Sequence, residues 1–115
     1  MIAFNIVRMR VKPGFEDEFI KVGSGQRRDN LVGLRSAHLV KTGERTYHFI
    51  GEWDSMEHLV AARPSMIKNL DASRPFLEDL GESLGVTDAA AGETVVSFIA
   101  ASKDNSRLGC PSASI

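Results

Sequence analysis

The chain has 115 residues, of which 43% are hydrophobic and 25% charged, and its formal net charge at pH 7 is -1. This length suits one domain with a single core and excludes a multidomain enzyme. A charge near zero provides no basic field for phosphate groups, so we expect no nucleic-acid partner and no membrane partner.

The N-terminal segment and the single cysteine indicate a cytoplasmic protein. Arg8 and Arg10 interrupt the first apolar run, whereas a signal peptide carries its basic residues before an uninterrupted apolar region. No apolar run is long enough to span a bilayer. Cys110 can form neither an intrachain disulfide nor a multi-cysteine metal site, which suits a reducing compartment.

The first elements are predicted to be a strand and a helix. Residues 2–11 carry apolar side chains on both faces, which is typical of a central strand. The tripeptide "KPG" ends this strand, because proline cannot donate to a β-ladder. Phe15, Phe19 and Val22 then recur at helical spacing, and the predicted helix frays near Gly23.

A β-hairpin is predicted next, with strands at residues 33–41 and 46–53 joined by "TGER". If the loop is centred on Gly43 and Glu44, the opposed pairs are Leu34 with Trp53, Ser36 with Gly51, His38 with Phe49, and Val40 with Tyr47. On the other face Arg35 would meet Glu52. A loop of odd length would shift this register by one residue and separate these pairs.

The second half of the chain is predicted to hold a helix and a last strand. "DSME" at 54–57 resembles a capping box, and the helix that follows is expected to kink or break at Pro64. A short turn is expected at "SRPFLEDLG", and "ETVVSFIA" at 93–100 is the predicted last strand. Residues 1–100 would form one domain, followed by a polar, flexible tail at 101–115.

This order of elements predicts an α+β fold of the ferredoxin-like βαββαβ type, with an antiparallel sheet and both helices on one face. The first and last predicted strands are apolar on both faces. The face without helices would therefore expose a large apolar patch, which monomers rarely tolerate. We expect a homodimer that packs sheet against sheet.

The chain resembles the antibiotic biosynthesis monooxygenase-type family of dimeric α/β barrels over roughly residues 2–100. The resemblance rests on "VKPGFEDEF" after the first strand, on "GLRSAHLV", and on "FIGEWDSMEHL", where Trp53 ends a strand and Asp54 and Ser55 open a helix. The family includes cofactor-independent oxygenases of aromatic compounds, haem-degrading monooxygenases and proteins without a known reaction. The resemblance implies a small hydrophobic or aromatic ligand and no cofactor.

The polar residues of the family's best-defined sites are missing here. Phe49 and Leu59 stand where the anthrone-type oxygenases carry an Asn and a Tyr around the strand-closing Trp. Val7 stands at the position of the first-strand Asn in the haem-degrading members, whose helix Trp and His positions fall near Ala62 and Ala72. Asn5, on the same face as Val7, is a displaced substitute.

The candidate site follows from the hairpin register, which assigns one face of the hairpin to the helix side. That face would contain Leu34, Ser36, His38, Val40, Tyr47, Phe49 and Trp53. His38 is the candidate catalytic residue, because imidazole exchanges protons near neutral pH. Asn5, Ser36, Tyr47, Phe49 and Trp53 are the candidate substrate-binding residues. Each also has a purely structural interpretation, as a packed or internally hydrogen-bonded side chain.

Other chemistries have less support. We expect no metal site, because His38 and His48 face opposite sides in this register. No Ser, His and acid triad is identifiable. A cofactor-independent monooxygenase is one hypothesis, and a non-catalytic ligand-binding or stress-associated barrel is the alternative. Isomerase or lyase chemistry on the same scaffold stays open.

Overall fold

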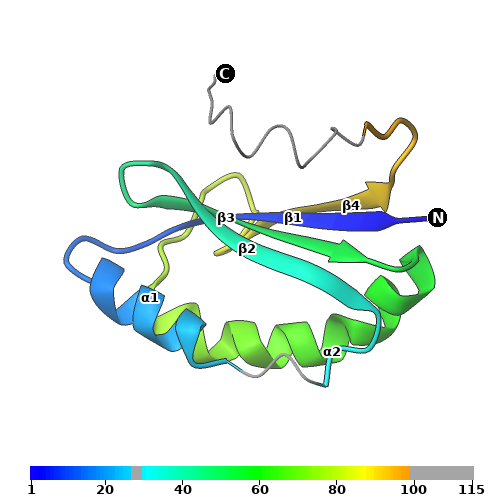
Figure 1. Ribbon diagram of the computed structural model, residues 1–115. Helices are drawn as coiled ribbons and strands as arrows, with labels where there is room; N and C mark the ends of the chain where they lie inside the picture. Colours follow the sequence, from blue (N-terminus) through cyan, green and yellow to red (C-terminus); the bar gives the residue numbers. More distant parts are fainter. Residues whose placement is uncertain (27–29, 99–115) are drawn as a thin grey trace, which may run out of the picture.

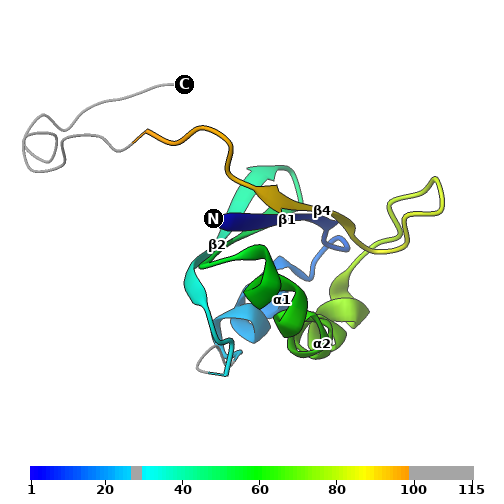
Figure 2. The same cartoon turned by 90° about the vertical axis from the view of Figure 1, so that its right-hand side faces the viewer.

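The computed structural model describes residues 1–26 and 30–98 and contains one four-stranded antiparallel sheet with both long helices on one side (Figures 1 and 2). The elements are β1 (Ala3–Arg10), α1 (Glu16–Ser24), β2 (Leu34–Gly43), β3 (Thr46–Trp53), α2 (Met56–Ser73), the 3-10 helix η1 (Arg74–Phe76) and β4 (Asp88–Glu93). The strand order is β2-β3-β1-β4. The predicted α+β ferredoxin-like fold is confirmed. None of the described helices has the length and apolar character needed to cross a membrane.

The hairpin forms, but its register differs from the prediction. Leu34 lies opposite Trp53 as expected, whereas His38 lies opposite Ile50 and Val40 opposite His48. The turn is centred on Glu44 and Arg45, and irregularities between Leu34 and Ser36 and between Lys41 and Gly43 each shift the pairing. The backbone of Arg45 has φ 56°. The shift by one residue exchanges the two faces of the middle of β2.

Helix α2 begins at a side-chain cap and continues past its proline. Ser55 is the N-cap, and its hydroxyl accepts a hydrogen bond from the backbone N–H of His58. The predicted interruption at Pro64 is wrong, because the helix runs from Met56 to Ser73. Pro64 and Val60 are both exposed, so water can take the hydrogen bond that the proline cannot donate.

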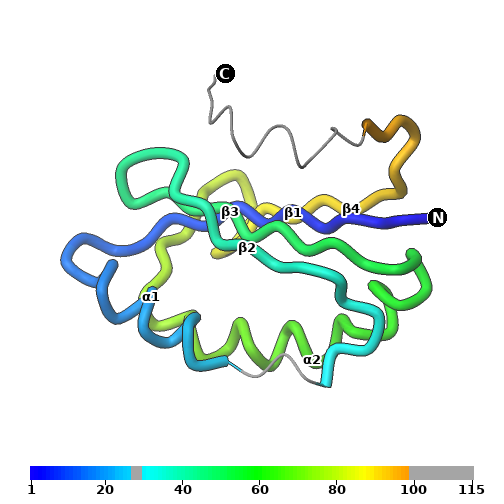
Figure 3. The backbone as a smooth tube through the Cα atoms, viewed as in Figure 1, coloured from blue at the N-terminus to red at the C-terminus, as the bar shows by residue number. Residues whose placement is uncertain are grey.

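The last strand lies earlier in the chain than predicted. Strand β4 comprises "DAAAGE" and pairs with β1, with Ala91 opposite Asn5. Figure 3 shows the two strands side by side although they are far apart in the sequence. Residues 94–98 lie outside the sheet, and the remainder of the predicted strand and the predicted tail at 101–115 lie outside the described residues. The sequence pattern favoured the β-branched residues after Glu93, whereas the segment that pairs with β1 consists largely of alanine and glycine.

The core consists of two clusters on the helix side of the sheet. One cluster is centred on Trp53 and Leu59, where β3 meets α2. The other contains Phe19 of α1, Tyr47 of β3 and Leu77 after η1. Each cluster joins the sheet to the helix layer at a different place along β3. The space between the two clusters is therefore bounded by packed side chains on both sides.

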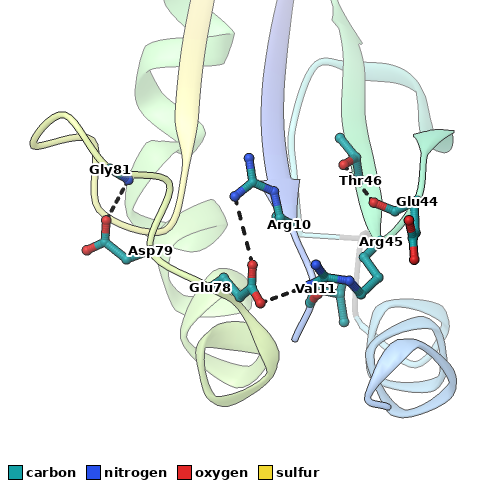
Figure 4. Close-up of polar contacts among 8 residues, drawn as sticks. All are labelled: Arg10, Val11, Glu44, Arg45, Thr46, Glu78, Asp79 and Gly81. Carbon is teal, nitrogen blue, oxygen red and sulfur yellow. Dashed lines mark hydrogen bonds and ion pairs between the residues drawn. The ribbon is translucent and has the colours of Figure 1, made fainter. Parts of the chain in front are cut away.

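The half-buried side chain of Arg45 connects the hairpin turn to the end of β1 and to the segment after η1 (Figure 4). Arg45 Nη1 donates to the carbonyl oxygen of Val11 at 2.8 Å and contacts Glu78 Oε2 at 2.8 Å. Arg10 forms a longer contact of 3.8 Å with the same carboxylate. These bonds fix the end of the hairpin from which Tyr47 projects.

Candidate functional site

A cavity of about 960 Å³ lies between the helix side of the sheet and the two helices. Its sheet wall includes Asn5, Val7, Met9, Leu39, Lys41, Tyr47, Phe49 and the alanines of β4. Its helix wall includes Glu16, Phe19, Ile20, Leu59, Arg63, Met66, Ile67 and Leu70. Apolar surface dominates the cavity, and further polar residues line it, namely Asp17, Ser24, Gln26, Asn69, Ser73 and Thr87. This is the character of a small-ligand site.

Asn5 and Ser73 are both buried polar residues of the cavity wall, and Asn5 has 6% of its surface exposed. Its Oδ1 accepts a hydrogen bond from Trp53 Nε1 at 2.8 Å, and its Nδ2 lies 3.6 Å from Met66 Sδ. A thioether is a weak acceptor, and an amide nitrogen carries two N–H donors. Asn5 therefore has donor capacity available for a ligand.

Gly51 provides the space in which this amide sits. It lies opposite Asn5 in the pairing of β1 with β3. A Cβ atom at Gly51 would lie 2.5 Å from Asn5 Oδ1 and 2.9 Å from Trp53 Nε1. The glycine is thus required by close approach of the two bonded side chains.

Farther along the sheet, three side chains form a charged cluster. Tyr47 donates its hydroxyl hydrogen to Glu16 Oε1 at 2.5 Å, and Lys41 Nζ lies 2.9 Å from the same oxygen. The Tyr47 and Lys41 hydrogen bonds lower the pKa of Glu16, and Glu16 in turn raises the pKa of Lys41. Burial, followed by the hydrogen bond to Glu16, raises the pKa of Tyr47. At neutral pH the cluster is a carboxylate, an ammonium and a neutral phenol.

The structure separates the predicted site residues into three groups: residues that line the cavity, a residue behind its wall, and residues on the opposite face of the sheet. Asn5, Tyr47 and Phe49 line the cavity. Trp53 is fully buried behind the cavity wall and acts on it through Asn5.

The predicted cavity position of His38 is wrong, and so is that of Ser36. Both side chains lie on the face of the sheet without helices, because the register shift exchanged the faces of β2. Ser36 Oγ donates there to Glu52 Oε1 at 3.2 Å. The predicted contact between Arg35 and Glu52 is confirmed at 3.4 Å.

The register shift brings Leu39 and Lys41 into the cavity in place of His38 and Val40. Glu16 and Arg63 are further residues that pattern reading missed. Glu16 is indistinguishable in sequence from an ordinary acidic helix start. The position of Arg63 could have been predicted, since it falls with Leu59 on the apolar stripe by which α2 faces the sheet.

The histidines do not converge on a metal site. His38 and His48 share the face without helices, contrary to the prediction that they face opposite sides. His48 Nδ1 lies 3.0 Å from the Thr42 hydroxyl. No group of three or more His, Cys, Asp or Glu side chains suited to a metal ion occurs in residues 1–26 and 30–98.

The amino-acid sequence matches no protein-family model and no curated protein. The fold, however, matches solved structures over most of both chains. A candidate antibiotic biosynthesis monooxygenase from Chloroflexus aurantiacus J-10-fl is 19% identical, with a TM-score of 0.63 over 85% of this chain and 97% of that one. SnoaB, a cofactor-independent oxygenase from Streptomyces nogalater, is 14% identical, with a TM-score of 0.63 over 84% and 96%.

A third similar structure is a dimeric ferredoxin-like protein from an uncultured marine organism. It is 17% identical to this chain, with a TM-score of 0.65 over 86% of this chain and 92% of that one. Likeness at these identities establishes architecture and leaves activity to the residues of the site. The chain therefore has the ferredoxin-like fold found in proteins named as antibiotic biosynthesis monooxygenases.

Proposed function

We propose that the cavity binds a small, largely apolar ring compound that offers a hydrogen-bond acceptor to Asn5. The observation that carries this proposal is the buried Asn5 amide in an apolar cavity of about 960 Å³. Trp53 occupies the carbonyl oxygen of the amide, so the amide presents its N–H groups to the ligand. A site built to hydrogen-bond one ligand group rejects analogues that lack this group, because its own polar atoms are then left unpaired.

Binding is better supported than acid-base catalysis. A general base works best with a pKa near the operating pH. The pKa of Glu16 is lowered by its hydrogen bonds, while the pKa values of Lys41 and Tyr47 are raised. All three shifts move away from neutrality, so this cluster favours holding a ligand over exchanging protons with it.

Cofactor-independent oxygenation is the second candidate function. It is favoured by the shared fold with SnoaB and by the N–H groups of Asn5, which would stabilise negative charge on a substrate oxygen. In such a reaction a phenol or quinol gives a proton to water, and the resulting carbanion transfers electrons directly to O₂ to form a hydroperoxide on a ring C–H carbon. Loss of water from this hydroperoxide leaves one oxygen atom on the ring as a carbonyl group. Asn5 would then hold the anionic oxygen while the ring reacts.

We also infer that two copies pair through the sheet face without helices. Ile6 on this face is 43% exposed, and Val95 and Phe98 after β4 are 90% and 91% exposed. In Figure 1 the segment that follows β4 leaves the sheet on the side opposite the helices. Exposed apolar surface of this kind is typical of an interface, and a structure with the same fold is described as dimeric.

The binding proposal is tested by calorimetry with 1-tetralone and tetralin, which differ by one carbonyl oxygen. Wild-type protein is expected to bind tetralone more tightly, and Asn5→Leu is expected to bind both equally. The double variant Asn5→Leu with Trp53→Phe repeats the test without leaving the indole N–H unpaired. Equal binding of the two compounds by wild type, or no saturable binding, would contradict the proposal. Oxygen uptake with anthrone, in wild type and Asn5→Leu, tests the second candidate.

A further inference from the structure

We propose that the ligand carries an anionic group, a carboxylate in the simplest case, that pairs with Arg63. This inference rests on the proposed binding function and specifies the charge of the ligand. Arg63 lines the cavity from α2, between Leu59 and Met66, which line it too. A guanidinium group matches a carboxylate in shape and can form two parallel hydrogen bonds with it.

Arg63 has no partner of its own in the described part of the chain. It forms no hydrogen bond or ion pair with any residue in 1–26 and 30–98. The positions three and four residues away, where a helical ion pair would form, hold apolar side chains. These positions are Leu59, Val60, Met66 and Ile67. The charge is therefore available to a ligand.

The other cation in the cavity wall is already neutralised. Lys41 Nζ lies 2.9 Å from Glu16 Oε1, and Asp17 adds a second carboxylate to the same part of the wall. The start of α1 is thus acidic. An anionic ligand group would be repelled there and attracted at Arg63.

These two regions lie at different ends of the helix layer. Gln26, just after α1, donates to the carbonyl oxygen of Asn69 at 2.6 Å. Arg63 precedes Asn69 along α2 by about 9 Å, toward the start of that helix. Glu16 lies about 12 Å from Ser24 at the other end of α1, where the ring of the adjacent Phe15 stacks on Phe76, beyond the end of α2. The charge distribution therefore favours one orientation of the ligand.

Met66 relates the positions of Asn5 and Arg63 in the cavity wall. The Asn5 amide contacts Met66 Sδ at 3.6 Å, and Arg63 lies one helical turn from Met66 on the same side of α2. The N–H groups of Asn5 and the guanidinium of Arg63 are all donors. One carboxylate, or a carboxylate beside a ring carbonyl, would satisfy both residues.

The test compares 2-naphthoate with its neutral methyl ester by calorimetry. Wild type is expected to bind the anion about tenfold more tightly, and this preference is expected to fall at high salt. Arg63→Gln should lose this preference while its affinity for the ester stays unchanged. Lys68→Gln is the matched control, because Lys68 is an exposed cation on the same helix that does not line the cavity.

The outcomes separate the two proposals. If wild type and Arg63→Gln bind both compounds equally, the cavity binds ring compounds but the inference about charge is wrong. If Lys68→Gln loses the preference as fully as Arg63→Gln, the effect is one of net charge and the assignment to Arg63 is wrong. If neither compound binds saturably to wild type, the binding function itself is wrong. Both variants change exposed side chains, and urea unfolding checks that they are folded.

Discussion

Trp53 Nε1 donates to Asn5 Oδ1 at 2.8 Å, and both residues are buried. The bond joins β3 to β1 and determines which atoms of the Asn5 amide are free. Because Oδ1 is occupied, the cavity is offered N–H donors. Trp53 is thus a positioning residue for the site even though its ring does not line the cavity.

Removing both partners of this bond is expected to cost less than the sum of the two single removals. Trp53→Phe and Asn5→Leu each leave a buried polar atom unpaired, so each should lower the free energy of unfolding by about 1–3 kcal/mol beyond the packing loss. The double variant leaves neither atom unpaired and should lose less than the sum of the two. Urea unfolding of the four proteins measures this coupling. Strict additivity would show that the bond contributes nothing.

Gly51→Ala is expected to displace the Asn5 amide from its position in the cavity wall. The new Cβ would lie 2.5 Å from Asn5 Oδ1, so the amide must move, at a cost of about 1–3 kcal/mol in unfolding free energy. The preference for tetralone over tetralin should weaken in parallel. Gly92→Ala is the control, because a Cβ there meets no atom within 4 Å. Similar losses in both variants would point to strand propensity alone.

Tyr47 is the chain's only tyrosine, so the ultraviolet absorbance of ionised phenol reports its titration alone. We expect a pKa above the ordinary value of about 10, because burial and the Glu16 carboxylate both disfavour the phenolate. Glu16→Gln should lower this pKa without restoring the ordinary value, since burial remains. An unchanged titration in Glu16→Gln would contradict the hydrogen bond.

The sign of the linked stability effect follows from the same shift. The folded state binds the phenol proton more tightly than the unfolded state does, so this contribution to stability is fully present below about pH 10. It is lost as the pH rises from there through the folded-state pKa of Tyr47. Urea unfolding as a function of pH should therefore show a steeper alkaline loss in wild type than in Tyr47→Phe.

Ile6→Asp is expected to separate the proposed dimer into monomers. Ile6 lies on the sheet face without helices and is 43% exposed in the single chain, so a charge there would be buried in the interface. Val60→Asp is the matched control, because Val60 is 45% exposed on α2. Light scattering after size-exclusion chromatography gives the masses. A monomeric wild type, or a dimeric Ile6→Asp, would argue against this interface.

Local pattern was sufficient for most of the elements. The helical spacing of Phe15 and Phe19 and the strand that ends at Trp53 are both found in the structure. A helix start at "DSME" was predicted from a signal of the same kind, although the N-cap is Ser55 and not Asp54, with which the predicted capping box begins. Each of these features depends on neighbours within a few residues, which is why the sequence contains enough information to predict them.

The candidate site was predicted only in part. Asn5, Tyr47 and Phe49 line the cavity as expected, whereas His38 lies on the other face. The difference is one residue of register in the middle of β2, which comes from the irregularities at its two ends. No local pattern marks these irregularities.

Strand spacing and helix spacing in the sequence are therefore enough to predict the ferredoxin-like order of elements, with the exception of the position of β4. Tertiary pairing decides which faces and which distant groups meet, such as Asn5 with Trp53 and Glu16 with Lys41. The physical reason is that alternation repeats every two residues, so a slip of one residue exchanges the faces without changing the pattern.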